Sequence, residues 1–328
     1  MSRPGGLILL AALLLATMLV AVLVGETPLH GSDYLTALTH PGSAPGEILW
    51  TIRAPRACMA ALVGASLGLA GAALQGLLRN PLADPGVLGV SASAGLGAGV
   101  AIALGLAAIP GAIEVSALAG ALVAGALVVV LAARFREPET LILLGVSISA
   151  FAGALSSLVY NLSPSPITTA EVLSWMLGSV ANRDWPDLIR TALPAAAGAG
   201  LVAWSARGLT MLTLGEETAA LSGLPMARLR AAAVGGAALL AGASVAAAGI
   251  IGFVGLAAPH LVRRFAGDDP GKTLLPSALA GAGLLVLADL AARVIPTELE
   301  LKLGVVTALF GAPLFALVAW RAARSWRT

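Results

Sequence analysis

Charged side chains are scarce in this sequence. Its 328 residues include 19 basic and 17 acidic side chains, so that only 11% of the chain is charged. A soluble domain usually carries about 25% charged residues, because its surface must be polar. Aromatic residues are also few, at 4%, whereas 58% of the residues are hydrophobic. The composition excludes an ordinary soluble domain and predicts a chain whose outer solvent is lipid.

Cysteine and histidine are too few and too scattered to predict a metal site. The single Cys58 excludes a disulfide within the chain and any site with several cysteine ligands. The histidines, His30, His40 and His260, form no HExxH-type pair. An enzyme would need a nucleophile and a base at a recognisable spacing, and Cys58, His260 and Asp289 lie on different predicted segments. We therefore expect no metal and no catalytic residue, and an activity requiring Cys58 would revive the enzyme alternative.

Long apolar stretches follow one another along the whole chain. A helix that crosses a bilayer needs about 20 mostly apolar residues. Such windows occupy residues 6–25, 57–78, 87–105, 112–133, 141–160, 188–206, 229–248, 250–264, 274–293 and 303–321. No linker separates them, so the sequence predicts one transmembrane domain over residues 1–328. Its predicted fold is all-α, a polytopic membrane protein with about ten transmembrane helices.

The first window has two interpretations. Arg3 precedes an apolar run, as it would in a secretory signal peptide. The run is longer than the roughly 7–15 residues of a signal peptide's apolar region, which favours an uncleaved first helix.

The basic residues predict the orientation in the membrane. With a cytoplasmic N-terminus, the inside loops carry Arg3, Arg79, Arg134, Arg136, Arg207, Arg228, Arg230, Arg263, Arg264, Lys272, Arg321, Arg324 and Arg327. The outside loops carry Arg53, Arg56, Arg183, Arg190, Arg293 and Lys302. The excess inside follows the positive-inside rule, so both termini are expected to be cytoplasmic. The net charge is only +2 and no basic run is interleaved with aromatics, so no nucleic-acid partner is expected.

Two glycine-containing patterns resemble nucleotide sites but are better explained otherwise. Residues 266–273, AGDDPGKT, fit a relaxed phosphate-loop pattern. A phosphate loop follows a strand and opens a helix, whereas this stretch follows an apolar helix, and Asp268 and Asp269 would repel phosphate. The glycines at 95, 97 and 99, like Gly64 and Gly68, are expected to allow close helix packing. The chain itself is therefore expected to bind no ATP.

Arg53 and Arg56 flank Pro55 at the start of the second apolar window. Residues three apart share a helix face, and proline is favoured in the first helical turn. Both cations are predicted to lie outside, against the positive-inside trend. They would suit a soluble partner that presents carboxylates, because arginine binds carboxylates through two parallel hydrogen bonds. Snorkelling to lipid phosphate is an equally good explanation from the residues alone.

Two connections on the predicted cytoplasmic side carry candidate functional residues. Residues 79–86, RNPLADPG, break the helix, and irregular backbone near the membrane survives where protein buries it or where it lines a cavity. That stretch is a candidate gate or an ordinary tight loop. Residues 215–225, GEETAALSGLP, favour a short amphipathic helix ended by Gly223, which would dock a soluble partner, or else a solvated loop.

Two further features lie within apolar windows. The glycines and proline of residues 249–263 predict a broken, tightly packed helix with Gly252, Gly255, Pro259 and His260 as structural residues. His260 is expected to satisfy backbone carbonyls freed by Pro259. Asp289 and Arg293 lie four apart on one predicted helix face, and they are expected to pair, although an acid within a span is also a candidate for proton transport.

Taken together, six motifs in order resemble the FecCD family of ABC importer permeases over residues 53–320. They are RAPR at 53–56, the QxxxRNPLAxPxxLG stretch at 75–89, WMLGS at 175–179, GEE at 215–217, the GxxGFxGLxxPHxxR run at 249–263, and Ala288-Asp289 with Arg293 ahead of Gly311-Ala312-Pro313. One departure is Lys302, where many members have proline. The extra cation would alter the outer surface or the substrate preference.

The resemblance implies a subunit of an importer for iron–siderophores, haem or cobalamin in the inner membrane. The implied partners are a second copy of the chain, two cytoplasmic ATPase subunits that bind the ATP and Mg, and a periplasmic binding protein. It implies that Arg53, Arg56 and Arg293 receive the binding protein and that Asn80, Pro81 and Leu82 form a cytoplasmic gate. The implied ATPase coupling residues are Gly215, Glu216, Glu217, Ala220, Leu221, Gly223, Leu224 and Pro225. The alternative is an ion-coupled secondary transporter without an ATPase, for which only Asp289 is well placed.

Overall fold

The computed structural model describes residues 4–25, 27–134, 138–163, 165–295 and 301–325. The long helices of this part of the chain are α1 (Pro4–Leu23), α4 (Ala54–Leu78), α5 (Val90–Ala103), α6 (Ala112–Arg134), α7 (Pro138–Asn161), α9 (Trp185–Met211), α11 (Met226–Ala248), α12 (Val254–Ala266), α13 (Pro270–Val294) and α14 (Leu303–Ser325). Shorter elements are α2 (Gly31–Thr39), α3 (Ala44–Glu47), α8 (Pro166–Met176), α10 (Glu216–Leu221), a π-helical turn η1 (Ile48–Arg53), and the 3₁₀ turns η2 (Pro85–Leu88), η3 (Leu106–Ala108) and η4 (Leu212–Leu214). None of the described residues forms a β-strand, which confirms the all-α prediction.

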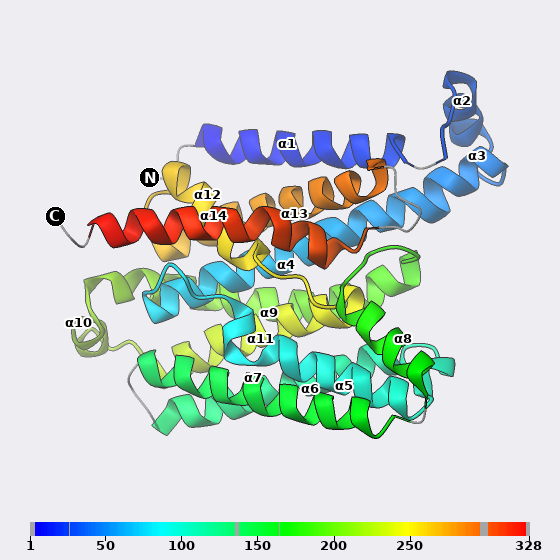
Figure 1. The fold of residues 1–328 in the computed structure, drawn as a ribbon. Helices are drawn as coiled ribbons and strands as arrows, with labels where there is room; N and C mark the ends of the chain where they lie inside the picture. The colour runs from blue at the N-terminus through cyan, green and yellow to red at the C-terminus, as the bar shows by residue number, and fades with distance from the viewer. Residues whose placement is uncertain (1–3, 26, 135–137, 164, 296–300, 326–328) are drawn as a thin grey trace.

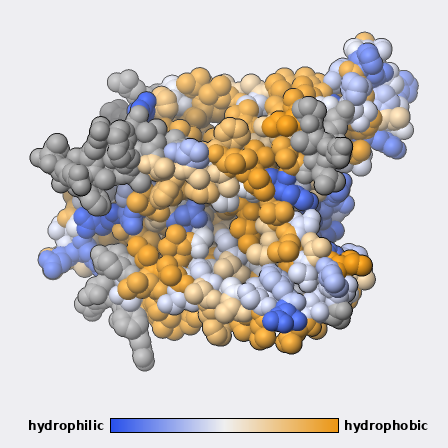
Figure 2. All heavy atoms as spheres, viewed as in Figure 1, coloured by the Kyte–Doolittle hydropathy of each residue, from blue (hydrophilic) through white to orange (hydrophobic). Residues whose placement is uncertain are grey.

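The long helices form one bundle in which most axes run in nearly the same or opposite directions (Figure 1). Helices α1 and α13 lie on one side, α4, α9 and α11 in the middle, and α5, α6 and α7 on the other side. Apolar side chains cover much of the flank, and hydrophilic ones gather toward the two ends (Figure 2). That distribution suits a bundle whose flank meets lipid and whose ends meet water.

The ten predicted windows all coincide with helices, but two of the helices are shorter than expected. Seven helices are long and apolar enough to cross a membrane by length and composition. Helix α5 has 14 residues, whereas α14 extends beyond its predicted window to Ser325. Helix α12 has only 13 residues, because the chain unwinds over residues 249–253 before it begins. The expected eighth helix at 250–264 therefore starts later and ends later than predicted.

The two ends of the bundle carry the loops expected on opposite sides of the membrane. Helix α1 begins and α14 ends at the end that carries α10, whereas α2, α3 and the start of α4 lie at the other end (Figure 1). By the positive-inside rule the first is the cytoplasmic end and the second the outer end. Arg3, Arg136 and Arg327, which belong to the predicted inside set, lie outside the described residues.

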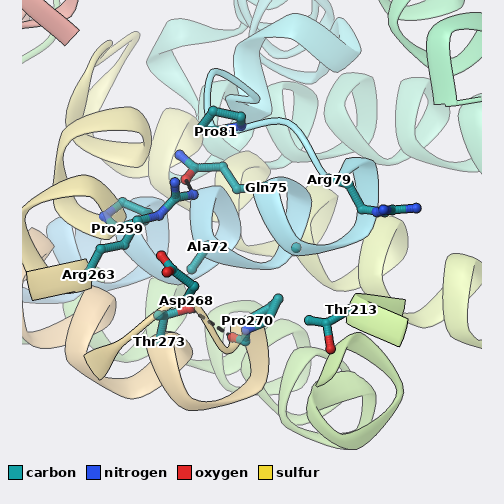
Figure 3. Close-up of a pocket in the computed structure, with 11 residues that line it drawn as sticks. Ala72, Gln75, Arg79, Pro81, Thr213, Pro259, Arg263, Asp268, Pro270 and Thr273 are labelled. Carbon is teal, nitrogen blue, oxygen red and sulfur yellow. Dashed lines mark hydrogen bonds between the residues drawn. The ribbon is translucent and has the colours of Figure 1, made fainter. Parts of the chain in front are cut away.

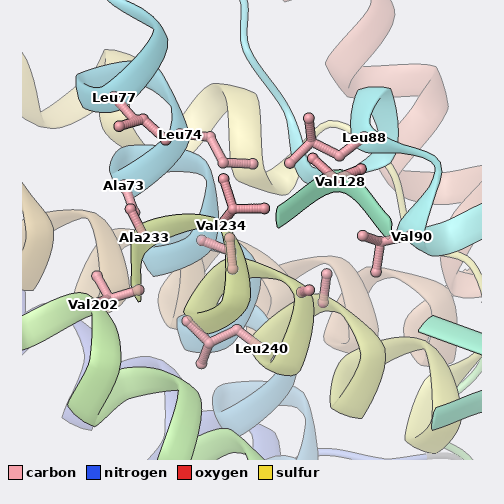
Figure 4. Packing of buried hydrophobic residues seen from close by; sticks show 14 of the residues in the cluster. Ala73, Leu74, Leu77, Leu88, Val90, Val128, Val202, Ala233, Val234 and Leu240 are labelled. Atoms are coloured by element: carbon pink, nitrogen blue, oxygen red, sulfur yellow. The ribbon is translucent and has the colours of Figure 1, made fainter. Parts of the chain in front are cut away.

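The middle of the bundle is built from small residues. In α11 83% of the apolar window is buried and in α4 72%, whereas in α1 the value is 6%, so α1 lies at the periphery. The core around α4 and α11 joins alanines to a few larger side chains (Figure 4): Ala73, Leu74, Leu77, Leu88, Val90, Val128, Val202, Ala233, Val234 and Leu240. Small side chains let helix backbones approach closely. The resulting van der Waals contacts stabilise the packing, because the hydrophobic effect does not drive helices together in lipid.

Gly64 and Gly68 of α4 show that approach directly. A Cβ added at Gly64 would overlap the carbonyl oxygen of Gly281 in α13, and one added at Gly68 would overlap that of Ser277. Gly97 approaches the backbone of Ser116 in α6 in the same way. The predicted packing role of Gly64, Gly68 and Gly97 is confirmed.

Candidate functional site

A buried carboxylate at the outer end of the bundle binds two arginines. Arg56 of α4 donates from Nε and Nη2 to Oδ1 of Asp289 in α13 at 3.0 and 2.9 Å. Arg293 lies one turn further along α13, and its Nη2 is 3.0 Å from Oδ2 of Asp289. The predicted Asp289–Arg293 pair is therefore confirmed, and Arg56 joins it from a second helix. The Asp289 side chain is only 2% exposed, so the cluster is internal.

Two arginines satisfy the end of α1. The last carbonyls of a helix have no partner within the helix and need donors from elsewhere. Arg53 donates from Nη1 to the carbonyl oxygen of Leu23 at 2.6 Å and from Nη2 to that of Thr27. Arg293 donates from Nη1 to the carbonyl oxygen of Ala21 at 3.1 Å. These bonds tie the poorly buried α1 to α4 and α13.

The structure thus brings Arg53, Arg56 and Arg293 together at the outer end, as the family pattern implies. It also gives each of them a partner within the chain, and Arg56 is 11% exposed while Arg293 is 3% exposed. The sequence placed Arg53 and Arg56 on one helix face at the outer side, whereas Arg53 belongs to the π-helical turn η1 that precedes α4 and is buried. Their docking role stays a prediction.

The predicted gate residues form a tight turn after α4. Arg79 ends α4 in the left-handed conformation, with φ of 49°. Asn80 then accepts a hydrogen bond at Oδ1 from the backbone N–H of Leu82 at 2.9 Å, which fixes the turn around Pro81. Pro81 itself is exposed at the cytoplasmic end. The geometry is that of an ordered, capped loop, and the gating role remains untested.

Asp84 follows this turn and caps η2. Its Oδ1 accepts a hydrogen bond from the backbone N–H of Gly86 at 2.8 Å. Burial raises the pKa of the Asp84 carboxyl, and the Gly86 hydrogen bond offsets part of that rise. A Cβ added at Gly255 would lie 2.9 Å from Oδ2 of Asp84, so α12 packs directly on this carboxylate.

The predicted coupling segment contains the short helix α10. Glu216 and Glu217 occupy its first turn, where acidic groups are favoured. The helix ends as the sequence predicted: Gly223 has φ of 85° and donates to the carbonyl of Ala220, while Leu224 donates to that of Ala219. This pair of bonds is the Schellman motif.

One face of α10 is anchored to the protein and the other is open. Glu216 forms an ion pair with Arg230 of α11, and Ala219 is buried. Leu221 is 90% exposed, and Glu217 and Ala220 are also exposed. A short, anchored helix with an exposed leucine beside an acid is suited to dock a soluble partner.

Three unwound backbone segments meet where the chain breaks between α11 and α12. Ser179 donates its N–H to the carbonyl of Ala248, Ile250 donates to Met176, and Leu303 and Gly304 donate to Gly178 and Leu177. These bonds satisfy polar backbone that lies among apolar helices. The sequence predicted a broken helix over residues 249–263. Spacing alone did not show that residues 176–179 and 302–304 form hydrogen bonds at this break.

The other predicted residues of the broken helix fall on both sides of the break. Gly252 lies in the unwound segment, whereas Gly255, Pro259 and His260 lie within α12. A Cβ added at Gly71 of α4 would overlap the carbonyl oxygen of Gly255, and one added at Gly255 would crowd Asp84 and the carbonyl oxygen of Leu67. The predicted structural role of Gly255 is thus accounted for by close packing.

Two cavities flank the junction of unwound segments. One of about 640 Å³ is apolar and is lined in part by Met176, Ile250, Gly252 and Pro313. The other, of about 360 Å³ at the outer end, is polar and is lined in part by Glu171, Arg183 and Lys302. Lys302, the departure from the family pattern, therefore borders a polar cavity.

The stretch that resembles a phosphate loop is the turn between α12 and α13. Asp269 caps α13 by accepting a hydrogen bond from the backbone N–H of Gly271 at 3.0 Å. Partial burial raises the pKa of Asp269, but hydrogen bonds from Lys272 and Thr210 outweigh that effect and hold the pKa below its usual value. The helix N-terminus is thus occupied by the protein's own carboxylate, and no strand precedes the turn in the described part of the chain.

The described residues contain no group of three or more histidine, cysteine, aspartate or glutamate side chains that could hold a metal ion. Cys58 lies half-buried in α4.

Comparisons with known proteins agree with the geometry of this chain. The model of the FecCD transport family matches residues 13–321. The chain is 42% identical over 291 residues to the uncharacterized ABC transporter permease protein YvrB of Bacillus subtilis, covering 86% of this chain and 81% of that protein. It is 37% identical over 326 residues to the vitamin B12 import system permease protein BtuC of Shigella flexneri, covering 97% and 95%.

The fold is shared as well. A solved structure described as an inward-facing conformation of a metal-chelate type ABC transporter superposes with a TM-score of 0.85 at 29% sequence identity, covering 97% of this chain and all of that one. The family match spans almost the whole chain and includes every motif discussed above. This chain belongs to the FecCD transport family of ABC importer permeases.

Proposed function

We propose that this permease moves an iron chelate, either a siderophore complex or haem, or else cobalamin, from the periplasm to the cytoplasm. Its likeness to a vitamin B12 import permease supports cobalamin, and its likeness to a metal-chelate type transporter supports a chelate cargo. The apolar cavity of about 640 Å³ beside the unwound junction offers a place where such a cargo passes. Iron chelates are preferred on family frequency.

The working assembly that we propose has two copies of this chain, two cytoplasmic ATPase subunits and a periplasmic binding protein. The chain itself binds no cofactor, and ATP with Mg is bound by the ATPase subunits. A second copy would cover the apolar face of α12 and α14, where Leu309 and Phe310 are exposed beside a cavity of about 400 Å³. Exposed apolar area of this kind marks a contact with lipid or with another helix.

The observation that carries the proposal is the separation of two candidate docking elements. The arginines of α4 and α13 lie at the outer end, and α10 lies at the cytoplasmic end (Figure 1). An importer of this kind needs a delivery site on one side of the membrane and an energy-coupling site on the other. Arg53, Arg56 and Arg293 are proposed for the first, residues 215–225 for the second, and Asn80, Pro81 and Leu82 for the gate.

Reconstitution tests this proposal. Proteoliposomes that contain the permease and its ATPase, supplied with the binding protein, are expected to accumulate one radiolabelled cargo among ferric siderophore, haem and cobalamin, and only with ATP. Uptake driven by a proton gradient without the ATPase would favour the secondary transporter. Asp289 is buried and paired with two arginines, which argues against a secondary transporter that uses Asp289 as its proton carrier, because such a carboxylate must exchange its proton with water.

A further inference from the structure

A cavity of about 270 Å³ lies at the cytoplasmic end between the end of α4, η4 and the turn from α12 to α13 (Figure 3). Its lining residues are Ala72, Gln75, Gly76, Arg79, Pro81, Thr213, Pro259, Arg263, Asp268, Pro270 and Thr273. Of the residues proposed above for docking, gating or coupling, only Pro81 of the gate lines this cavity, and no ligand has been assigned to it. Its wall holds a buried amide and two arginines, which is an unusual set of donors for an otherwise apolar bundle.

Gln75 has an unsatisfied donor in this wall. Its side chain is buried, with 4% of the residue exposed, and its Oε1 accepts a hydrogen bond from Nη2 of Arg263 at 2.9 Å. Its Nε2 has no hydrogen-bond partner among the described residues. Figure 3 shows this nitrogen turned away from Arg263, toward Pro81. The amide cannot be reversed to relieve the problem, because Nε2 would then face the donors of Arg263.

A buried donor without a partner is unfavourable, so such a group usually marks a water, an ion or a ligand. The charges around Gln75 favour an anion over water alone. Arg79 and Arg263 contribute two positive charges to the lining, whereas Asp268 contributes one negative charge, so the lining carries a net positive charge. The carboxylate of Asp268 lies on the side of Arg263 (Figure 3) and offsets the charge of one arginine but not of both.

The second aspartate of the turn does not oppose an anion. Asp269 is engaged with the hydroxyl of Thr210 at 2.6 Å, with Nζ of Lys272 at 2.8 Å and with the backbone N–H of Gly271. Those contacts also occupy the N-terminus of α13, so the donors to any anion in the cavity are side chains. The site is therefore unrelated to a phosphate loop, although part of the same stretch lines it.

We propose that this cavity binds a phosphate-class oxyanion, held by Gln75, Arg263 and Arg79. Phosphate has four oxygens that accept hydrogen bonds, and guanidinium groups match its geometry. The oxyanion is either free phosphate from the cytoplasm or the phosphate of an anionic lipid headgroup, because the cavity lies at the membrane's cytoplasmic end.

The proposal is tested on the full chain, delipidated in a maltoside detergent, by its thermal unfolding midpoint at constant ionic strength. One arm adds inorganic phosphate against chloride. The other adds phosphatidylglycerol against diacylglycerol, which has the same tails and no phosphate. Ligand that binds only the folded protein raises the midpoint in a saturable way. Wild type is expected to show this rise in at least one arm.

Three variants make the result specific. Gln75→Glu keeps an acceptor for Arg263 but places a carboxylate in the cavity, and it should weaken the apparent affinity at least tenfold. Arg79→Gln changes an exposed residue, so it should fold, and it should weaken the affinity several-fold. Lys272→Gln removes a cation of the same turn that does not line the cavity, and it should leave the affinity within twofold.

A response to phosphate identifies the free ion, and a response to phosphatidylglycerol alone identifies the headgroup; both support the site. The proposal is overturned if neither arm shifts the midpoint of wild type. It is also overturned if Arg79→Gln and Lys272→Gln weaken the response equally, since that pattern is general charge screening.

Discussion

Asp289 binds Arg56 although the two residues are separated by 233 positions in the sequence. The same carboxylate binds Arg293 one turn away, so a single buried anion is shared by two cations. This arrangement joins α4 to α13. Arg53 and Arg293 also donate hydrogen bonds to carbonyl oxygens at the end of α1. The cations proposed to receive a binding protein are therefore also structural residues.

Replacing Asp289 by Asn should destabilise the protein severely. Two buried guanidinium groups would lose their counter-charge, and breaking a buried pair in this way typically costs about 3–5 kcal/mol. The measurement is the unfolding midpoint in detergent. Arg190→Gln serves as the control, because Arg190 is exposed and pairs at the surface with Asp187, where such a pair is worth about 0–1 kcal/mol. Equal midpoints for the two variants would contradict the structural role.

Arg56→Glu should weaken association with the binding protein, and more so at low salt, because exposed electrostatic contacts are screened. The structure shows that this variant alone is ambiguous, since it also sets a second carboxylate against Asp289. Arg56→Gln removes the charge of Arg56 without adding a carboxylate, and its amide can still donate a hydrogen bond toward Asp289, so it separates the two effects. Docking is measured by pull-down across a range of ionic strengths.

Arg56→Gln has two distinguishable outcomes. If the charge of Arg56 contacts the partner, Arg56→Gln has an unfolding midpoint closer to wild type than Arg56→Glu has, but it does not recover the affinity. Recovery of both would mean that Arg56 acts only by holding α4 to α13, and the docking assignment would then be withdrawn.

The exposed face of α10 gives a third prediction. Glu217→Lys reverses a charge that has no structural partner among the described residues, so the permease should fold normally. In proteoliposomes the ATPase should still hydrolyse ATP while cargo uptake falls at least tenfold. Glu216→Gln is a companion variant on the same turn: it removes the ion pair with Arg230 that anchors α10 and keeps Glu217 exposed, so it separates anchoring of the helix from the charge of its open face. Normal coupling in Glu217→Lys would remove the assignment of α10.

The helix positions could be predicted because lipid imposes a length of about 20 apolar residues on each crossing. The same rule missed the shortness of α5 and α12. Helix α5 is preceded by the 3₁₀ turn η2, whose hydrogen bonds are local. Helix α12 is preceded by an unwound segment that hydrogen-bonds to residues 176–179, which in turn bind the start of α14. The short helix α8 was also missed, because its 11 residues are too few to cross a membrane and belong to a stretch classed as a polar connection.

In the candidate site too, local features could be predicted from the sequence, whereas contacts between distant helices could not. Asp289 and Arg293 could be paired from their spacing on one helix, and the end of α10 could be predicted from Gly223. The contact with Arg56 and the capping of α1 by Arg53 depend on how helices distant in sequence pack, and no spacing rule contains that information. The burial of these arginines could not be predicted for the same reason.

Two glycines on α13 provide a matched test of close packing. A Cβ at Gly281 would overlap the carbonyl oxygen of Gly64, whereas one at Gly283 would meet nothing within 4 Å. Gly281→Val should therefore force α4 and α13 apart and lower stability by at least about 1–3 kcal/mol, the usual cost of overpacking. Gly283→Val should cost well under half as much. Thermal unfolding of the two variants side by side decides the matter, and equal losses would contradict the packing argument.

The buried carboxyl of Asp84 predicts a specific dependence of stability on pH. Because its pKa is raised in the folded protein, Asp84 binds more protons when folded than when unfolded over the range between the two pKa values. Its contribution to stability is therefore present at acid pH and is lost as the pH rises through the folded-state pKa. Asp84→Asn removes this titration and can keep the hydrogen bond from Gly86 through its amide oxygen.

The difference in unfolding midpoint between Asp84→Asn and wild type isolates this carboxyl from all other titrating groups. The unfolding midpoint of Asp84→Asn minus that of wild type should be larger at pH 8 than at pH 5. Asp269→Asn is the control that should show no change between pH 5 and pH 8, because the pKa of Asp269 is lowered and its contribution to stability is lost only at more acid pH. A wild-type advantage over Asp84→Asn that grows with pH would show that the Asp84 carboxylate is stabilised by its surroundings, and the argument from burial would be wrong.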